Sequence, residues 1–249
     1  MSGVITVTVA QTRGSVPREE GTAMQVTPHG QSGTIGGGAL EYEAARIARQ
    51  MLADGRDTQE RTFPLGPDLG QCCGGSVTLM FQAGETTRAP TAPPLWIWGG
   101  GHVGRALAHV MAPFEDRTIT VIDTTSDRMP PLPSGVLPLV AHDPLRVVDR
   151  APQTADHIIV TYSHALDLAL CDALLRHGFG SCGLIGSATK WARFRRRLAS
   201  MGHEDAQITR IACPIGDPTL GKHPQAIAVG VAAALISPMA THAIGEKTG

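Results

Sequence analysis

Residues Leu95–Met111, LWIWGGGHVGRALAHVM, set the architecture of the second half of the chain. Four apolar residues lead directly into a glycine turn, GGGHVG, which is followed by apolar residues at helical spacing. The turn at residues 99–104 fits the pattern G-x-G-x-x-G, and its place between a strand and a helix makes the match more specific. Glycines in such a turn let the backbone approach a phosphate, and the first N–H groups of the helix face it. The stretch therefore predicts a nucleotide-binding type of strand, turn and helix.

The candidate nucleotide-binding residues are Gly99, Gly101, His102, Gly104 and Asp123. Asp123 ends the next apolar strand, 19 residues after Gly104, near the place of a ribose-binding carboxylate in such folds. The alternative is that the glycines only pack the strand against its helix, because this arrangement does not by itself imply a dehydrogenase.

Apolar strands alternate with helices through the rest of the chain. Continuous apolar runs are typical of strands buried on both faces, and their alternation with helices favours a doubly wound, Rossmann-like parallel sheet. The expected strands are residues 95–98, 118–123, 137–140, 157–162, 181–187 and 208–213, and the expected helices are residues 102–111, 167–178, 189–202 and 223–237.

The first 84 residues have a different pattern, which predicts a small α+β domain. Alternating residues from Val4 to Val9 indicate a strand, and apolar residues at helical spacing before Gly55 indicate a helix within residues 36–55. Residues 62–75, TFPLGPDLGQCCGG, are expected to form a loop because they are rich in glycine and proline. The predicted organisation is α/β: an N-terminal domain over residues 1–84, a linker over residues 85–94 and a Rossmann-like domain over residues 95–249.

Composition excludes several classes of protein. The chain has 249 residues, with 21 basic and 22 acidic residues and a net charge of −1, which argues against binding nucleic acid by bulk charge. Aromatic residues make up only 4%, so few side chains are available to stack on bases. No run approaches the roughly 20 apolar residues of a membrane helix, and the N-terminus lacks the pattern of a signal peptide. Five cysteines without paired C-x-x-C spacing are typical of a reducing, cytoplasmic location.

A second candidate site contains Gln71, Cys72 and Cys73, in the sequence QCCGG. In a glycine-flanked loop at least one thiol can face a ligand, and a thiolate is a soft ligand for molybdenum, copper or an iron–sulfur species. The alternative is a buried pair of small apolar residues at the start of a strand.

Two weaker candidates precede the cysteines. Gly36, Gly37 and Gly38 stand before the first helix, where they predict either a backbone cradle for an anion or a tight turn. Arg13 and Arg18 flank another turn and could clamp a phosphate, although surface arginines beside turns are common.

Two further groups favour structural roles. Ser163, His164 and Asp167 lack the surroundings of a hydrolase triad and are expected to cap a helix or to line a cleft. Arg193, Arg195, Arg196 and Arg197 lie on one helix, where a solvated basic face and a surface for an acidic partner are the two interpretations.

Seven motifs occur in one order that resembles the XdhC/CoxI family, the xanthine dehydrogenase accessory proteins. The resemblance runs from about Val9 to Ile236, and the QCCGG form is similar to the xanthine dehydrogenase branch. The motifs are RGSVPREEGTAMQV, GTIGGGALE, LGQCCGG, GGGHVGRALA, YSHALD, GLIGSATKWARF and CPIGD…HPQAIAVGVAAAL.

The resemblance implies a cytoplasmic chaperone for the molybdenum cofactor (molybdopterin), rather than an enzyme. Such a protein binds the cofactor, protects it while a cysteine desulfurase supplies the terminal sulfur, and passes it to xanthine dehydrogenase; a homodimer is expected. On this basis Cys73, and then Cys72, become the leading cofactor-binding residues and possible molybdenum ligands. Two other interpretations remain open: an NAD(P)-dependent oxidoreductase that uses the turn at residues 99–104, and a Rossmann-like domain that is only an assembly surface.

Overall fold

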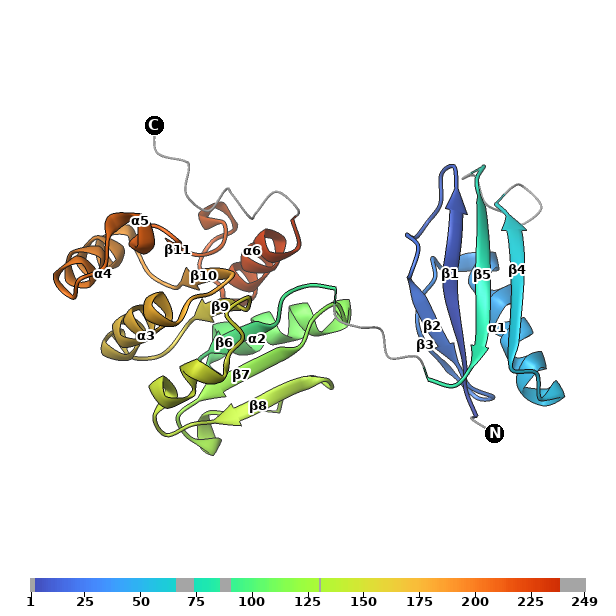
Figure 1. Cartoon of the computed structure of the whole chain (residues 1–249), viewed down its shortest axis with the longest axis horizontal. Helices are drawn as coiled ribbons and strands as arrows, with labels where there is room; N and C mark the ends of the chain where they lie inside the picture. Colours follow the sequence, from blue (N-terminus) through green and yellow to red (C-terminus); the bar gives the residue numbers. More distant parts are fainter. Residues whose placement is uncertain (1–2, 66–73, 86–90, 130, 238–249) are drawn as a thin grey trace. The chain divides into compact units, whose positions relative to one another are not determined.

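The computed structural model describes residues 3–65, 74–85, 91–129 and 131–237. The chain divides into two compact units, Met1–Arg88 and Ala89–Gly249. Each unit has its own sheet (Figure 1), and each is described by itself.

The first unit is a five-stranded antiparallel sheet in the order β3-β2-β1-β5-β4, packed on one helix (Figure 1). Alternation of apolar and polar residues along β1 and β5 gives the sheet one buried face, which contacts the apolar side of α1. The elements are β1 Ile5–Arg13, β2 Ala23–Val26, β3 Gln31–Gly33, α1 Gly38–Asp54, β4 Thr58–Pro64 and β5 Ser76–Ala83.

The helix expected within residues 36–55 is confirmed. Leu40, Ala44, Ala48 and Met51 of α1 are buried at the expected spacing. Gly55 ends the helix in the left-handed conformation, with φ 68°, and its N–H donates to the carbonyl of Met51.

Several boundaries predicted from the sequence are wrong. In the second unit, residues 208–213 were expected to form one strand, but only Ile211 and Ala212 do, and Ile208 is helical. The first unit has a similar error. Thr62–Pro64 were expected to be loop, but they pair with β5 as the end of β4. β4 is an edge strand in which Phe63 is the buried residue. Because an edge strand has one neighbour and a largely solvated surface, it lacks the apolar alternation that identifies a strand from sequence.

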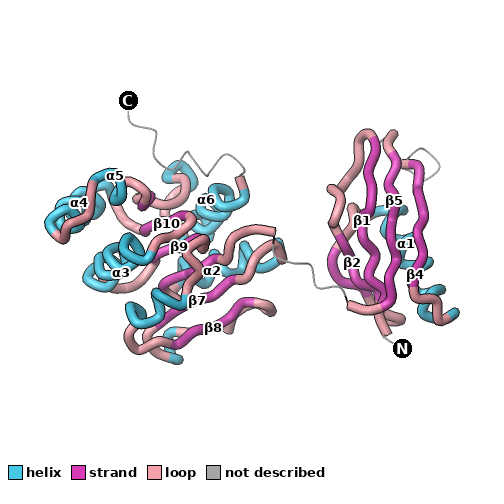
Figure 2. The backbone as a smooth tube through the Cα atoms, viewed as in Figure 1, coloured by secondary structure: helices cyan, strands magenta, loops and turns pink. Residues whose placement is uncertain are grey.

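The second unit is a six-stranded parallel sheet in the order β11-β10-β9-β6-β7-β8. Figure 2 shows these strands with helices along both sides. The strands are β6 Leu95–Trp98, β7 Ile119–Asp123, β8 Val136–Val140, β9 Asp156–Ile159, β10 Ser181–Leu184 and β11 Ile211–Ala212. The helices are α2 His102–Met111, α3 His164–His177, α4 Ala188–Ser200, α5 Asp205–Ile208 and α6 Pro224–Ile236.

This sheet confirms the predicted Rossmann-like fold. Numbered by their order in this unit, the strands run 3-2-1-4-5-6 from the β8 edge to the β11 edge. The connections leave β6 and β9 in opposite directions, so the strand order reverses between these two neighbours. In open parallel sheets, ligands bind beyond the carboxyl ends of the strands at such a switch point.

Separate apolar cores fill the two faces of the second sheet. Trp96 and Trp98 of β6 pack towards α3 and α4, whereas Leu95 and Ile97 of the same strand pack towards α2 and α6. This arrangement explains the continuous apolar runs in the sequence, since successive side chains enter different cores. In the described part of the chain, no helix is both long enough and apolar enough to cross a bilayer.

Candidate functional site

The glycine turn begins where β6 ends. The N–H of Gly99 donates to the carbonyl of Ile122 at 2.7 Å, which ties the turn to β7. Gly99 has φ 123°, and a Cβ atom there would lie 2.6 Å from the carbonyl oxygen of Val160. The close approach of two backbones and the positive φ both require glycine at this position.

The other two glycines of the motif have opposite surroundings. A Cβ atom on Gly104 would collide with the carbonyl oxygen of Gly99, so Gly104 lets α2 pack closely on the turn. A Cβ atom on Gly101, by contrast, would meet nothing within 4 Å. Gly101 caps the N-terminus of α2 without a side-chain hydrogen bond, and His102 follows as the exposed first residue of the helix. Space for a ligand therefore lies at Gly101 and His102.

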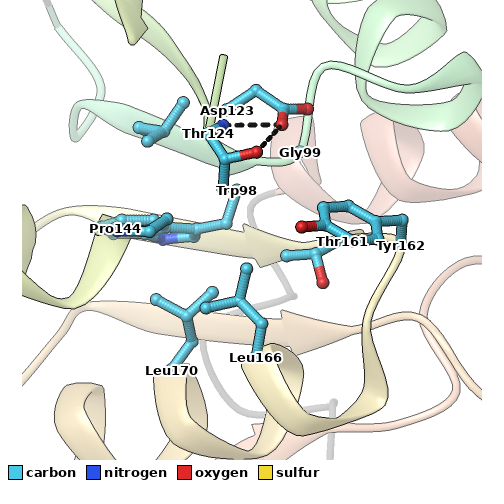
Figure 3. A pocket seen from close by; sticks show the side chains of 10 residues that line it. Trp98, Gly99, Asp123, Thr124, Pro144, Thr161, Tyr162, Leu166 and Leu170 are labelled. Atoms are coloured by element: carbon cyan, nitrogen blue, oxygen red, sulfur yellow. Dashed lines mark hydrogen bonds between the residues drawn. The ribbon is translucent and has the colours of Figure 1, made fainter. Parts of the chain in front are cut away.

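Asp123 braces the turn from the end of β7. Its Oδ2 accepts the N–H of Gly100 at 2.8 Å. Its Oδ1 accepts the N–H of Thr124 at 2.7 Å (Figure 3). Arg128 Nε lies 3.3 Å from the same Oδ1, and Asp123 is only 6% exposed. Both carboxylate oxygens are thus engaged by the protein, and a ribose hydroxyl would have to compete for them.

Arg128 also contacts Tyr162, which follows β9. The guanidinium carbon lies 3.8 Å from the centre of the Tyr162 ring, while the tyrosine itself is 62% exposed. Because β6 lies between β7 and β9, the interactions of Asp123, Arg128 and Tyr162 cross the carboxyl end of β6. This cation–π pair therefore lies next to the switch point, at the carboxyl ends of the strands.

The pocket beneath this pair is small. Trp98, Thr161 and Leu166 are among the residues that face it, and Asp123 lies at its rim (Figure 3). Its volume of about 10 Å³ is close to the room that one water molecule needs. This hollow is therefore too small to hold a nucleotide base or ribose.

The arginine loop of the first unit lies at one end of its sheet. Arg13, the last residue of β1, pairs with Ser76, the first residue of β5. Ser15 then forms an isolated bridge with Gly74, and a Cβ atom on Gly75 would collide with the carbonyl oxygens of Arg13 and Ser15. The backbone after β1 is therefore packed against the two glycines that follow Cys73 in the chain.

The first glycine run lies against the same loop. A Cβ atom on Gly36 would be 2.6 Å from Cγ of Pro17, so this glycine is required for close packing. Arg13 and Arg18 are exposed, and neither forms an ion pair with a carboxylate of the described residues. The structure thus places both candidate arginines and residues 36–38 around one loop.

The cradle made by the glycine run holds a carboxylate of the chain itself. Glu41 Oε2 accepts the N–H groups of Ile35 at 3.1 Å and Gly37 at 3.0 Å, and the hydroxyl of Thr34 at 2.6 Å. Its Oε1 accepts a bond from Gln31 at 2.9 Å. Burial alone would raise the pKa of Glu41, but these hydrogen bonds outweigh it, and the pKa is lowered.

Three of the five cysteines are poor metal ligands at neutral pH. Burial raises the pKa of Cys171 and of Cys182, and it raises the pKa of Cys213 to about 11. These thiols are therefore protonated, whereas metals bind the thiolate. Gln71, Cys72 and Cys73 lie outside the described residues. Within the described ranges, no group of three His, Cys, Asp or Glu side chains is arranged to hold a metal ion.

Sequence reasoning missed three of the interactions above. Glu41 was visible as an acidic residue in the first turn of a helix, which is a signal for an N-terminal carboxylate. The stacking of Arg128 on Tyr162 joins segments far apart in the chain and has no local signal. The same holds for the buried ion pair of Lys190 and Asp167, whose atoms Nζ and Oδ2 are 2.6 Å apart.

Two family models match the chain. Residues 95–235, more than half of the chain, match the XdhC Rossmann domain, and residues 2–63 match the XdhC and CoxI family. The chain belongs to the XdhC and CoxI family. The resemblance indicated by the order of the motifs is thereby confirmed.

Two curated relatives of this XdhC-family chain are proteins of Escherichia coli strain K12. The uncharacterized protein YqeB is 26% identical over 233 residues, which are 92% of this chain and 42% of YqeB. The molybdenum cofactor insertion chaperone PaoD is 36% identical over 83 residues, which are 32% of this chain and 26% of PaoD. The chain thus spans less than half the length of either relative.

A solved structure shares the fold of this family member over nearly its whole length. It is a protein of Bacillus halodurans described as a xanthine dehydrogenase, with a TM-score of 0.71 and 15% sequence identity. The superposition covers 95% of this chain and 94% of the other. At this level of identity the likeness shows the fold.

Proposed function

We propose that this protein is a molybdenum cofactor chaperone, which holds the cofactor while a cysteine desulfurase adds its terminal sulfur and then inserts it into xanthine dehydrogenase. The observation that supports this most directly is the packing of the Arg13–Arg18 loop against Gly74 and Gly75. This packing puts the backbone of Arg13 beside the residues that follow Cys73, while Arg18, further along the same loop, lies against Gly36, and neither arginine has a carboxylate partner among the described residues. The names of the family and of PaoD support the same role.

The residues present fit the chemistry of molybdopterin. Its phosphate suits Arg13 and Arg18, because guanidinium groups form paired hydrogen bonds with phosphate oxygens. Its metal end suits a soft thiolate, and the family resemblance makes Cys73, and then Cys72, the proposed ligands. When bound, the cofactor would supply an oxo-molybdenum centre that accepts sulfur.

The glycines of residues 36–38 take a supporting part in this proposal. Glu41 accepts the N–H of Gly37 and so fixes the glycine run. Gly36 in this run contacts Pro17 closely, and this contact positions the loop around Pro17. The phosphate is therefore assigned to the arginines rather than to the cradle.

For the second unit we propose a part in assembly rather than in catalysis. Asp123 is fully engaged, and the pocket at the switch point has room for about one water molecule. A nucleotide phosphate could still approach Gly101 and His102, which keeps NAD(P) binding as the alternative function. Formation of a homodimer is part of the proposal.

The decisive experiment compares Cys73→Ala with Cys213→Ala. Both remove one thiol, but Cys213 is half-buried and protonated at neutral pH. We expect Cys73→Ala to weaken retention of freshly prepared molybdenum cofactor by at least about tenfold, or about 1.4 kcal/mol. Retention is measured as molybdenum bound per chain after anaerobic gel filtration.

Titrations with NAD⁺, NADPH and FAD on the same samples test the alternative. Nicotinamide or flavin binding without retention of the molybdenum cofactor would overturn the proposal and make the turn at residues 99–104 the functional site. Equal retention of the molybdenum cofactor by Cys73→Ala and the wild type would show that the Cys73 thiolate is not a ligand.

A further inference from the structure

A second hollow, unconnected with the sites above, lies between α3 and α4. This α3–α4 groove has a volume of about 360 Å³, within the range of ligand pockets in proteins. The two helices lie side by side along one face of the sheet (Figure 1). The groove is lined by His164, Ala165, Leu168 and Ala169 of α3, by Lys190, Arg193, Phe194 and Arg197 of α4, and by Met201.

The lining combines an apolar floor with a basic rim. Met201 is 39% exposed, Leu168 and Phe194 reach the groove with only 7% and 6% of their surface, and no acidic residue is among the lining residues. Lys190 does not add free charge, because its Nζ is 2.6 Å from the buried Oδ2 of Asp167 and 2.7 Å from the carbonyl oxygen of Ile185. The uncompensated charge of the groove therefore comes from the arginines of α4.

The arginines of α4 fall into two pairs. Arg195 is bound to Asp205 at 2.6 Å, and Arg196 donates to the carbonyl of Ala192 at 3.3 Å, both outside the groove. Arg193 and Arg197 line the groove one turn apart. In the described part of the chain neither forms an ion pair with a carboxylate. Arg193 and Arg197 are thus the two arginines that face the groove, and neither is held by another group of the described residues through a hydrogen bond or an ion pair.

We propose that the α3–α4 groove binds an acidic amphipathic helix of a partner protein. The lining residues of α4 and Met201 span about three helical turns, or about 16 Å. A helix laid along this length would place apolar side chains on Leu168, Phe194 and Met201, and carboxylates beside Arg193 and Arg197. This inference does not depend on the proposed cofactor.

A small anion fits the groove less well. Specific small-molecule sites hold a few fixed polar groups that converge on the ligand. Here the floor is apolar, and the available donors are exposed arginines on the rim and His164 at the start of α3. Long flexible side chains lose entropy when they are fixed on one small ligand, whereas a helix contributes apolar burial as well.

The test uses the full chain and a synthetic 18-residue helical peptide with leucines on one face and glutamates on the other. Binding is measured by isothermal titration calorimetry at low and at moderate salt. We expect Arg193→Glu with Arg197→Glu to weaken binding by at least about tenfold, and added salt to weaken binding to the wild type. The matched control, Arg195→Glu with Arg196→Glu, makes the same charge change on the same helix and should bind nearly as the wild type does.

A steric variant tests the groove without a change of charge. Ala165 is exposed and lines the groove, so Ala165→Trp should also prevent binding while the thermal midpoint of unfolding stays near that of the wild type. The proposal is overturned if the wild type does not bind the glutamate peptide or binds a lysine counterpart equally well. The proposal is also overturned if the two double arginine variants weaken peptide binding equally, or if AMP displaces the peptide at equimolar concentration.

Discussion

Gly101 and Gly104 belong to one turn but face different neighbours. At Gly104 the space for a side chain is taken by the carbonyl of Gly99, and at Gly101 it is open. The fold therefore requires glycine at position 104, whereas the open space at Gly101 leaves room for a ligand. A glycine motif therefore contains both structural and ligand-facing positions, and a substitution can separate them.

We expect Gly104→Ala to destabilise the second unit by about 1–3 kcal/mol, because the new methyl group meets backbone that cannot move aside easily. Gly101→Ala is the matched control, since its φ of −67° suits alanine and its Cβ would be free of contacts. Urea unfolding of both variants measures the difference. Equal loss of stability in the two variants would contradict this assignment.

The position of this site could be predicted from sequence, and the nearness of Arg128 to Asp123 in the chain already indicated competition for the carboxylate, but the bond to Gly100 could not be predicted. The strand, the turn and Asp123 follow from local pattern, and the structure has them where they were expected. The partners of the Asp123 carboxylate are Thr124 and Arg128, which follow it closely in the chain, and Gly100, which lies 23 residues before it. Such a choice among donors depends on tertiary packing, which a local motif does not encode.

The start of α1 is stabilised by a side chain from within the helix. Glu41 bonds to the backbone of Ile35 and Gly37, ahead of the first helical residue, and so ties the β3–α1 turn to the helix. Its negative charge also lies at the positive end of the helix dipole. Both effects require the ionised carboxylate.

The pKa of Glu41 is lowered in the folded protein, so its contribution to stability is present above the ordinary pKa of the unfolded chain and is lost as pH falls through the folded pKa. We expect Glu41→Gln to cost about 1 kcal/mol at pH 7 and to reduce the loss of stability on acidification below about pH 4.5. Free energies of unfolding from pH 3 to pH 7 measure this, with the exposed Glu60→Gln as the control. An unchanged pH profile in Glu41→Gln would refute it.

Lys190 and Asp167 join the first turns of α4 and α3. Asp167 is 1% exposed and also accepts the hydroxyl of Thr161 at 2.6 Å. A buried carboxylate without its partner pays a large desolvation cost. The ion pair therefore fixes the relative position of α3 and α4, the two helices that form the groove.

We expect Lys190→Met alone to lower the free energy of unfolding by about 3–5 kcal/mol, because it leaves the Asp167 charge buried and unpaired. The double variant Lys190→Met with Asp167→Leu should be more stable than Lys190→Met, since no buried charge remains. A double-mutant cycle by denaturant unfolding measures the coupling. Additive effects of the two changes would count against a direct interaction.

Elements were easiest to predict where burial dominates. β6, LWIW, is buried along its whole length, and the sequence shows it as an uninterrupted apolar run. β4 was partly missed because only Phe63 of its seven residues is buried. The short helix α5 was also missed, since four residues show no helical period.

The two units have separate cores. The core of the first is made by residues from Ile5 to Phe81, and those of the second by residues from Leu95 onwards. Each unit also contains a complete sheet of its own. Elements that share packing unfold together, so two units without a shared core favour two unfolding transitions.

We expect Phe81→Ala to lower only the first unit's transition and Leu107→Ala only the second unit's, by about 3–5 and 2–5 kcal/mol respectively. Both side chains are fully buried in their own core. Differential scanning calorimetry of the full chain separates the transitions. A single transition that both variants shift equally would show that the units unfold together.

All three tryptophans of the chain belong to the second unit and face the same core. Trp96 and Trp98 are buried on β6, and Trp191 packs against the same core from α4. The indole of Trp98 donates to His157 at 3.1 Å. Emission excited at the red edge of protein absorption therefore reports on one sheet face and leaves the first unit optically silent. A single tryptophan introduced near Arg13 would give that unit its own signal, and ligand arrival there could be followed in real time.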